Sequence, residues 1–130
     1  MPPLSIIFFS LPTYIGFADF AEWVGKIPDP LADNHFKSQY ALLYDEGQAL
    51  VDYVGKYEQL DKDWQLIAAK HTLDPQLEYS NSSKKNPGCH EDYRLYYTEP
   101  LVQLVYERYR KDVEMFGYER DYEQLLEFVR

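Results

Sequence analysis

The sequence predicts a mostly helical α/β protein that contains a short strand or hairpin. Residues 51–64 (VDYVGKYEQLDKDW) place β-branched and aromatic residues directly before a helical pattern, which predicts a buried strand running into a helix. Residues 99–116 carry apolar side chains at three- and four-residue spacing. This spacing predicts one long helix with a core face formed by Leu101, Val105, Tyr109, Val113 and Phe116. At 130 residues and 45% hydrophobic content, the chain is long enough for one domain with a core.

The chain begins with a hydrophobic segment, residues 1–16. Its apolar stretch is interrupted by Pro12 and is shorter than the ~20 residues that a membrane-spanning helix needs. No basic residue precedes the stretch, so it is a poor match to a secretory signal peptide. We expect a hydrophobic strand or hairpin here, and an anchor in a membrane interface is the alternative.

The next two elements follow from local patterns. An amphipathic helix is expected over Phe17–Gly25, because apolar side chains recur on one face until Pro28 and Pro30 extend the chain. Residues 40–44 and 49–57 have strand character and flank the turn sequence DEGQ. Two such runs around a glycine-containing turn predict a β-hairpin.

The second half of the chain is expected to be helical around one polar loop. Asp61 is a suitable N-cap for a helix over Asp61–Leu73, because its carboxylate accepts from free amides of the first turn. Residues 79–92 have loop chemistry, rich in serine and asparagine, and precede the long helix. Gly117 is the expected residue after that helix, and Asp121–Val129 is expected to add a final helical segment.

Charge and cysteine content limit the possible function classes. The formal net charge of −9 argues against general nucleic-acid binding, which needs a basic surface. The single cysteine, Cys89, excludes an internal disulfide and leaves no CxxC metal site. We therefore expect no nucleic-acid partner and no metal.

His35 is the candidate catalytic residue. It lies in the polar loop 33–39, where a histidine can act as a general base, and the nearby carboxylate of Asp33 can orient its ring. A surface or turn-stabilising histidine is the simpler interpretation, and spacing alone does not separate the two.

Two further segments can bind a ligand. Ser82, Ser83, Lys84 and Lys85 supply hydroxyls and two cations to the polar loop, as a phosphate requires. A solvated loop with two exposed lysines is the alternative. Tyr57, at the expected strand end, can stack on a nucleotide base or simply pack against the protein.

Taken in order, these segments resemble the C-terminal half of the sulfotransferases that modify carbohydrates, both the bacterial and the Golgi-type members. The similar segments are FADFAEWV, HFKSQ, VDYVGKYEQLDKDW, SNSSKK and DYRLYYTEPLVQLVYERYRKDVEMFGY, and they cover Phe17–Tyr118. Each segment alone is a weak match. The ordered set is more specific, above all the last segment together with GKYEQL.

The resemblance implies a reaction and a partial fold. It implies transfer of a sulfuryl group from 3′-phosphoadenosine 5′-phosphosulfate (PAPS), as co-substrate, to a hydroxyl or amine of a carbohydrate acceptor. Residues 17–130 would form the C-terminal part of a P-loop-like α/β sulfotransferase domain. A eukaryotic member would be expected at the Golgi membrane and a bacterial member in the cytoplasm.

The resemblance also suggests roles for individual residues. Tyr57 stands where related enzymes place a tyrosine against the adenine. Ser83, with Lys84 or Lys85, falls in a loop that would close over the nucleotide, and His35 would face the acceptor cleft.

One departure from the family pattern concerns the segment before Phe17. The family's phosphosulfate loop and its Arg-(Asn/Asp)-Pro motif for the 3′-phosphate would be expected there, and neither occurs in residues 1–16. Fixed cations stabilise the charge that develops during sulfuryl transfer, so the 130 residues are expected to be an incomplete and nearly inactive domain. The alternative is a non-catalytic helical interaction module or a decayed fragment. Such a module would bind a protein partner or self-associate through an exposed apolar N-terminal face.

Overall fold

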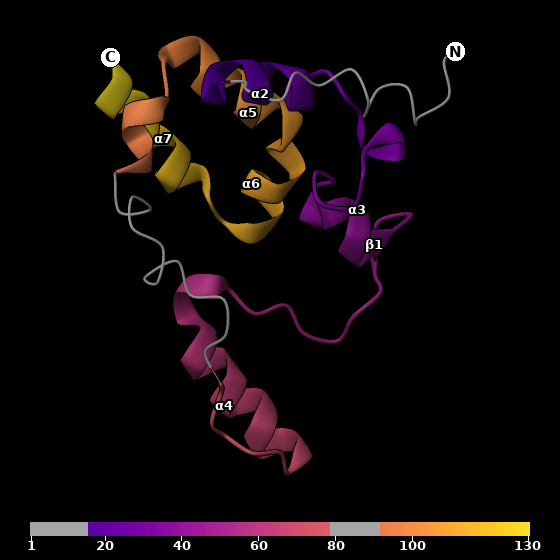
Figure 1. Cartoon of the computed structure of the whole chain (residues 1–130). Helices are drawn as coiled ribbons and strands as arrows, with labels where there is room; N and C mark the ends of the chain where they lie inside the picture. Colours follow the sequence, from indigo (N-terminus) through magenta and orange to yellow (C-terminus); the bar gives the residue numbers. More distant parts are fainter. Residues whose placement is uncertain (1–15, 79–91) are drawn as a thin grey trace. The chain divides into compact units, whose positions relative to one another are not determined.

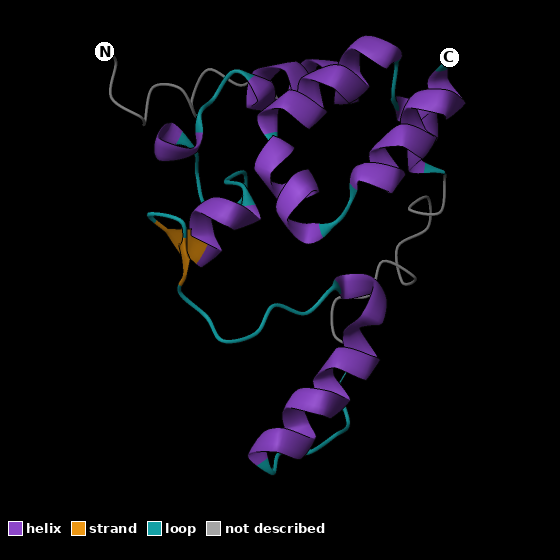
Figure 2. Cartoon of the chain, turned by 180° about the vertical axis from the view of Figure 1, so that it is seen from behind, coloured by secondary structure: helices purple, strands orange, loops and turns teal. Residues whose placement is uncertain are grey.

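The computed structural model describes residues 16–78 and 92–130. Of these described residues, 63% are helical, and the strands form a two-stranded antiparallel hairpin (Figure 2). The described residues divide into two compact units, one formed by residues 16–48 and 92–130 and the other by residues 49–78.

The first unit packs helices from both ends of the chain. Its described helices are α2 (Phe17–Gly25), α3 (Gln39–Leu43), α5 (Glu99–Arg108), α6 (Arg110–Phe116) and α7 (Glu119–Val129), with 3₁₀ turns at Asp29–Leu31 and Tyr93–Tyr96. Helix α2 lies against α5 (Figure 1). The buried apolar residues at this contact are Ala21, Val24, Leu101 and Val102. The N- and C-terminal segments of the sequence therefore share one core.

The helix expected over Phe17–Gly25 is confirmed with the same bounds, but the long helix is not continuous. Tyr109 interrupts it with φ −115° and ψ 26°, so residues 99–116 form α5 and α6. Gly117 has a φ of 75°, a left-handed conformation that suits glycine, and it ends α6 as expected. The final helix begins at Glu119, two residues before the predicted start.

The predicted hairpin is correct in its turn and wrong in its strands. Strand β1 is Tyr44–Asp45, strand β2 is Gln48–Ala49, and Glu46 and Gly47 between them both have positive φ. Of the residues 40–44 expected as strand, 40–43 belong to α3 (Gln39–Leu43) and only Tyr44 is in a strand. The Ser38 hydroxyl caps this helix by accepting from the amide of Ala41 at 3.1 Å, a side-chain contact that favours a helix start.

The second unit contains a 3₁₀ turn (Tyr57–Gln59) followed by α4 (Leu60–His71). The buried strand predicted over 51–57 is wrong, because residues 51–56 form no strand and Val51, Tyr53 and Val54 are exposed. The segment is tied to α4 by a side chain, since the Lys56 amide donates to the Asp63 carboxylate at 2.9 Å.

The helix predicted over Asp61–Leu73 is confirmed as α4, which spans Leu60–His71, but its N-cap differs from the prediction. The residue in the N-cap position is Gln59, and Asp61 lies inside the first turn. A carboxylate in the first turn still interacts favourably with the helix dipole.

These elements confirm a mostly helical chain with a small hairpin, as the fold class predicted. The described residues do not confirm the P-loop-like part of that prediction, since their only sheet is the two-stranded hairpin. Among the described helices, none has the length and apolar content to cross a membrane. Residues 16–78 and 92–130 also contain no group of three or more His, Cys, Asp or Glu side chains arranged to hold a metal ion.

Candidate functional site

His35 and Asp33 form a close pair in the loop before α3. The His35 amide donates to Asp33 Oδ1 at 2.9 Å, and the ring nitrogen Nδ1 of His35 is hydrogen-bonded to the same oxygen. The hydrogen bonds from the backbone and ring of His35 hold the pKa of Asp33 below its ordinary value. An ionised carboxylate only accepts, so we assign the ring proton to Nδ1.

The other ring nitrogen of His35, Nε2, is then the acceptor. The side chain of His35 is 87% exposed, so Nε2 is open to a molecule from solvent. A histidine whose Nδ1–H is held by a carboxylate and whose Nε2 is free has the arrangement of an oriented general base. The contact between Asp33 and His35 expected from the sequence is therefore present.

The backbone of Phe36 anchors the loop that carries His35 to Arg108, the last residue of α5, and to Tyr109, which follows it. The Phe36 carbonyl accepts from the Arg108 guanidinium at 3.1 Å and from the Tyr109 hydroxyl at 2.7 Å. The Phe36 ring packs edge-to-face against Phe20 and Trp23 of α2, with ring centroids 5.6 and 5.9 Å apart. The loop is therefore held by polar contacts from one helix and aromatic contacts from another.

A partly buried ionic network ties Ser38, near the end of this loop, to Asp29 in the preceding 3₁₀ turn. Asp29 Oδ1 accepts from the Ser38 amide and lies 2.8 Å from Arg108, and Asp29 Oδ2 accepts from the Ser38 hydroxyl at 2.6 Å. The Arg108 side chain is 6% exposed and that of Asp29 is 29% exposed. Burial alone would raise the pKa of Asp29, but the hydrogen bonds from Ser38 and the Arg108 cation outweigh it, and this pKa lies below its ordinary value.

Of the remaining sequence-predicted site residues, Tyr57 alone lies in the described part of the chain. Tyr57 is in the second unit, at the start of the 3₁₀ turn before α4, and it is 85% exposed, so its ring is available for stacking. Ser83, Lys84 and Lys85 lie outside the described residues. His35 belongs to the first unit and Tyr57 to the second.

The anchoring residues were missed by sequence reasoning. Arg108 and Tyr109 lie 72 and 73 positions from Phe36, and Tyr109 was assigned only to the core face of a helix. No local spacing marks such a contact. The available signal was Ser38 directly before a short run of helix-compatible residues, which is typical of an N-cap.

Comparison with known families gives one match. A family model described as "Sulfotransferase family" matches residues 10–119, which is more than half of the 130-residue chain. Neither the search of curated proteins nor the search of solved structures found a match.

Proposed function

Because the chain belongs to the sulfotransferase family, we propose that it takes part in sulfuryl transfer from PAPS to a hydroxyl or amine of a carbohydrate. The observation that carries the proposal is the family match over residues 10–119, combined with an exposed histidine that a carboxylate orients. The donor, the acceptor class and the P-loop-like fold are parts of this proposal.

On the acceptor side, His35 removes the proton. The acceptor oxygen or nitrogen forms a bond to sulfur, the bond from sulfur to the phosphate oxygen breaks, and 3′-phosphoadenosine 5′-phosphate (PAP) leaves. The proton of the acceptor group moves to Nε2 of His35, while Asp33 stabilises the imidazolium through Nδ1–H. The role of Asp33 is to orient the ring and to hold the proton of the neutral ring on Nδ1, which leaves Nε2 as the acceptor.

On the donor side, Tyr57 stacks on the adenine. Its high exposure fits this role, because an aromatic side chain that binds a base needs an open face. Ser83, Lys84 and Lys85 would contribute hydroxyl and ammonium groups to the nucleotide phosphates.

We further propose that the 130 residues supply only part of the catalytic machinery. No phosphosulfate-loop motif and no Arg-(Asn/Asp)-Pro motif occurs in this sequence. Cations fixed at the leaving phosphate and at the sulfuryl oxygens stabilise the charge of the transition state. Purified 130-residue protein is therefore expected to show transfer from labelled PAPS near the background rate, whereas clear turnover would contradict this incompleteness.

The test of the proposed function is a calorimetric titration of the 130-residue protein with PAP. Saturable binding is expected, and the Tyr57→Ala variant should bind about 5- to 100-fold more weakly because a base-stacking contact is lost. Tyr93→Ala is the matched control, since Tyr93 is also an exposed tyrosine but belongs to the first unit. The proposal fails if PAP does not bind, or if the two variants lose affinity equally.

A second candidate function is a non-catalytic interaction module. The specific observation in its favour is the number of exposed large apolar side chains in residues 49–78: Leu50, Val51, Tyr53, Val54, Tyr57, Leu60, Leu66 and Leu73. Exposed apolar surface of this kind is typical of contact with a partner. Size-exclusion chromatography with light scattering separates the alternatives, because a monomer at high concentration counts against self-association.

A further inference from the structure

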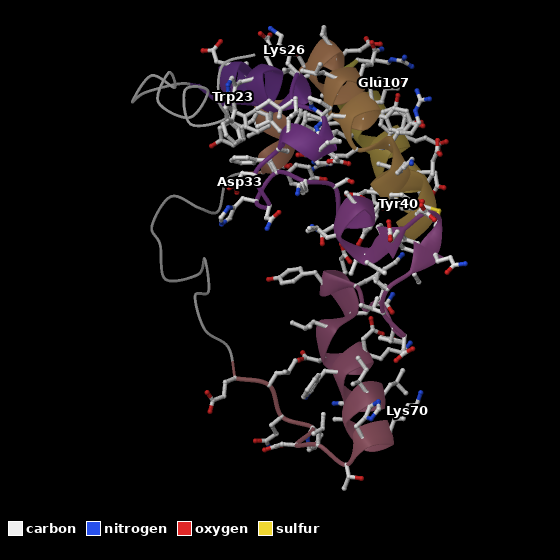
Figure 3. All side chains as sticks on the ribbon, turned by 90° about the vertical axis from the view of Figure 1, so that its right-hand side faces the viewer. Trp23, Lys26, Asp33, Tyr40, Lys70 and Glu107 are labelled. Carbon is white, nitrogen blue, oxygen red and sulfur yellow. The ribbon has the colours of Figure 1, made fainter. Side chains whose placement is uncertain are left out.

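A groove of about 840 Å³ lies in the first unit, between the C-terminal end of α2 and helices α3, α5 and α6. Three of its lining residues are labelled in Figure 3: Lys26 just after α2, Glu107 on α5 and Tyr40 on α3. Its volume is within the range of small-molecule sites, about 300–1,000 Å³. His35 is not among the residues that line the groove, so the groove is a separate feature from the exposed His35 side chain.

The groove is rich in cations on a strongly acidic protein. It is lined by Lys26, Arg108, Arg110 and Lys111, which are four of the thirteen lysines and arginines of the chain. Only Asp29 and Glu107, two of the twenty-two acidic residues, line it. Since the chain as a whole carries −9, a groove with two more cations than anions is a local positive site.

The two acidic side chains in the groove are already neutralised. Asp29 is paired with Arg108 and accepts from Ser38, and Glu107 forms an ion pair with Arg110. The positive charges left over belong to Lys26 and Lys111.

Neither lysine has a carboxylate partner in the described part of the chain. Lys111 lies over the ring of Tyr40, with Nζ 4.5 Å from the ring centroid. A helical neighbour, Glu107, is turned to Arg110 instead of Lys111. The Tyr40 ring is itself stacked on Tyr44, with ring centroids 4.9 Å apart and planes within 8°. The groove therefore combines two uncompensated ammonium groups with a fixed aromatic wall.

We propose that this groove binds a ligand that carries an oxyanion, a sulfate or phosphate ester. Lys26 and Lys111 pair with the oxyanion from the rim, and the Tyr40 ring packs against the apolar part of the ligand. Arg108, which is almost completely buried, forms the fixed wall rather than the contact. The oxyanion comes from a sulfated saccharide or from the phosphates of a nucleotide. The inference depends on the geometry of the first unit and not on the roles proposed for His35 and Tyr57.

The experiment compares two variants with the same change in charge. Lys26→Glu/Lys111→Glu removes the rim cations, and Lys62→Glu/Lys70→Glu changes two exposed lysines of α4 in the second unit. Lys70 is labelled in Figure 3. Each protein is titrated with a sulfated heparin-derived tetrasaccharide, with PAP, and with uncharged cellotetraose, and amide chemical shifts are followed by NMR.

The groove variant is expected to bind at least one anionic probe about tenfold more weakly or worse, while the α4 variant changes affinity less than about twofold. In the wild-type protein, the amides of Tyr40 and Lys111 should shift with that probe and not with cellotetraose. The probe that responds identifies the source of the oxyanion. Equal losses in both variants, or no saturable binding of either anionic probe, would overturn the inference.

The outcome is separable from that of the proposed function. Tyr57→Ala should leave binding of the tetrasaccharide unchanged, because Tyr57 does not line the groove. Loss of tetrasaccharide binding in the groove variant, with no PAP binding to any protein, would support the groove while contradicting the donor site.

Discussion

Replacing Asp29 with asparagine should destabilise the first unit through the buried guanidinium of Arg108. The substitution keeps the volume of the side chain and one acceptor oxygen, and it removes the negative charge 2.8 Å from Arg108. The hydroxyl and amide of Ser38 lose a charged acceptor at the same time. The perturbation therefore acts on charge and leaves shape nearly constant.

The expected loss follows from the burial of the two partners. Removing one partner of a fully buried ion pair costs about 3–5 kcal/mol, because the other charge stays buried without compensation. Arg108 is 6% exposed, but Asp29 is 29% exposed and water screens it in part. We therefore expect the free energy of unfolding of the first unit to fall by about 2–3 kcal/mol.

The assay is urea unfolding followed by the fluorescence of Trp23 in a Trp64→Phe background. Trp23 contacts Phe36 in the first unit, whereas Trp64 is on α4 of the second unit, so the signal then reports on the first unit. Asp92→Asn is the matched control, because it removes a carboxylate from an ion pair with Arg94 in which both side chains are exposed. Its loss should be much smaller.

The effect should depend on pH with a defined sign. The folded-state pKa of Asp29 lies below its ordinary value of 3.8, so its charge contributes stability above that pH. The contribution is lost as the pH falls through the folded-state pKa, and the stabilities of wild type and Asp29→Asn should then converge. A loss of stability in Asp29→Asn no larger than in Asp92→Asn, or a difference that persists unchanged at low pH, would contradict a stabilising role for the Asp29 charge.

Two further substitutions test how the helices are held. Asp112→Ala should lower the free energy of unfolding by about 1–2 kcal/mol. The Asp112 carboxylate on α6 accepts from the amides of Gln39 and Tyr40 at 2.8 and 2.7 Å, and these contacts cap α3. An unchanged stability in urea unfolding would contradict this capping role. Gly117→Ala should cost about 1–2 kcal/mol because of its positive φ. Gly16→Ala, where φ is −68° and a Cβ would meet no atom within 4 Å, should cost less; equal effects in thermal unfolding would argue against the backbone explanation.

Local sequence patterns predicted a helix correctly where the apolar face of that helix packs against a neighbouring helix. The helix Phe17–Gly25 has the predicted bounds because its apolar face packs on α5 and prolines follow it. The break at Tyr109 was not predictable from spacing. Its hydroxyl donates to the carbonyl of Phe36, a contact that only the folded chain creates.

The predicted strand at residues 51–57 failed for a physical reason. Val51, Tyr53 and Val54 have the side chains of a strand, but a strand also needs a hydrogen-bonded neighbour. Within the described residues this segment has no strand beside it, and the Asp63 side chain accepts from its Lys56 amide instead. The candidate site shows the same difference between local and distant contacts. The contact between Asp33 and His35 is local in sequence and was predicted, whereas the contact of Arg108 that holds the loop joins residues far apart and was not.

The position of the proton on the neutral His35 ring, measured by nitrogen-15 NMR, tests the proposed role of His35 directly. Asp33 should hold the proton on Nδ1 and leave Nε2 as the acceptor, and Asp33→Ala should move the proton toward Nε2. His71, at the end of α4, serves as the internal reference and should not change. A proton found mainly on Nε2 in the wild-type protein, or a ring unaffected by Asp33→Ala, would contradict the assignment of His35 as an oriented base.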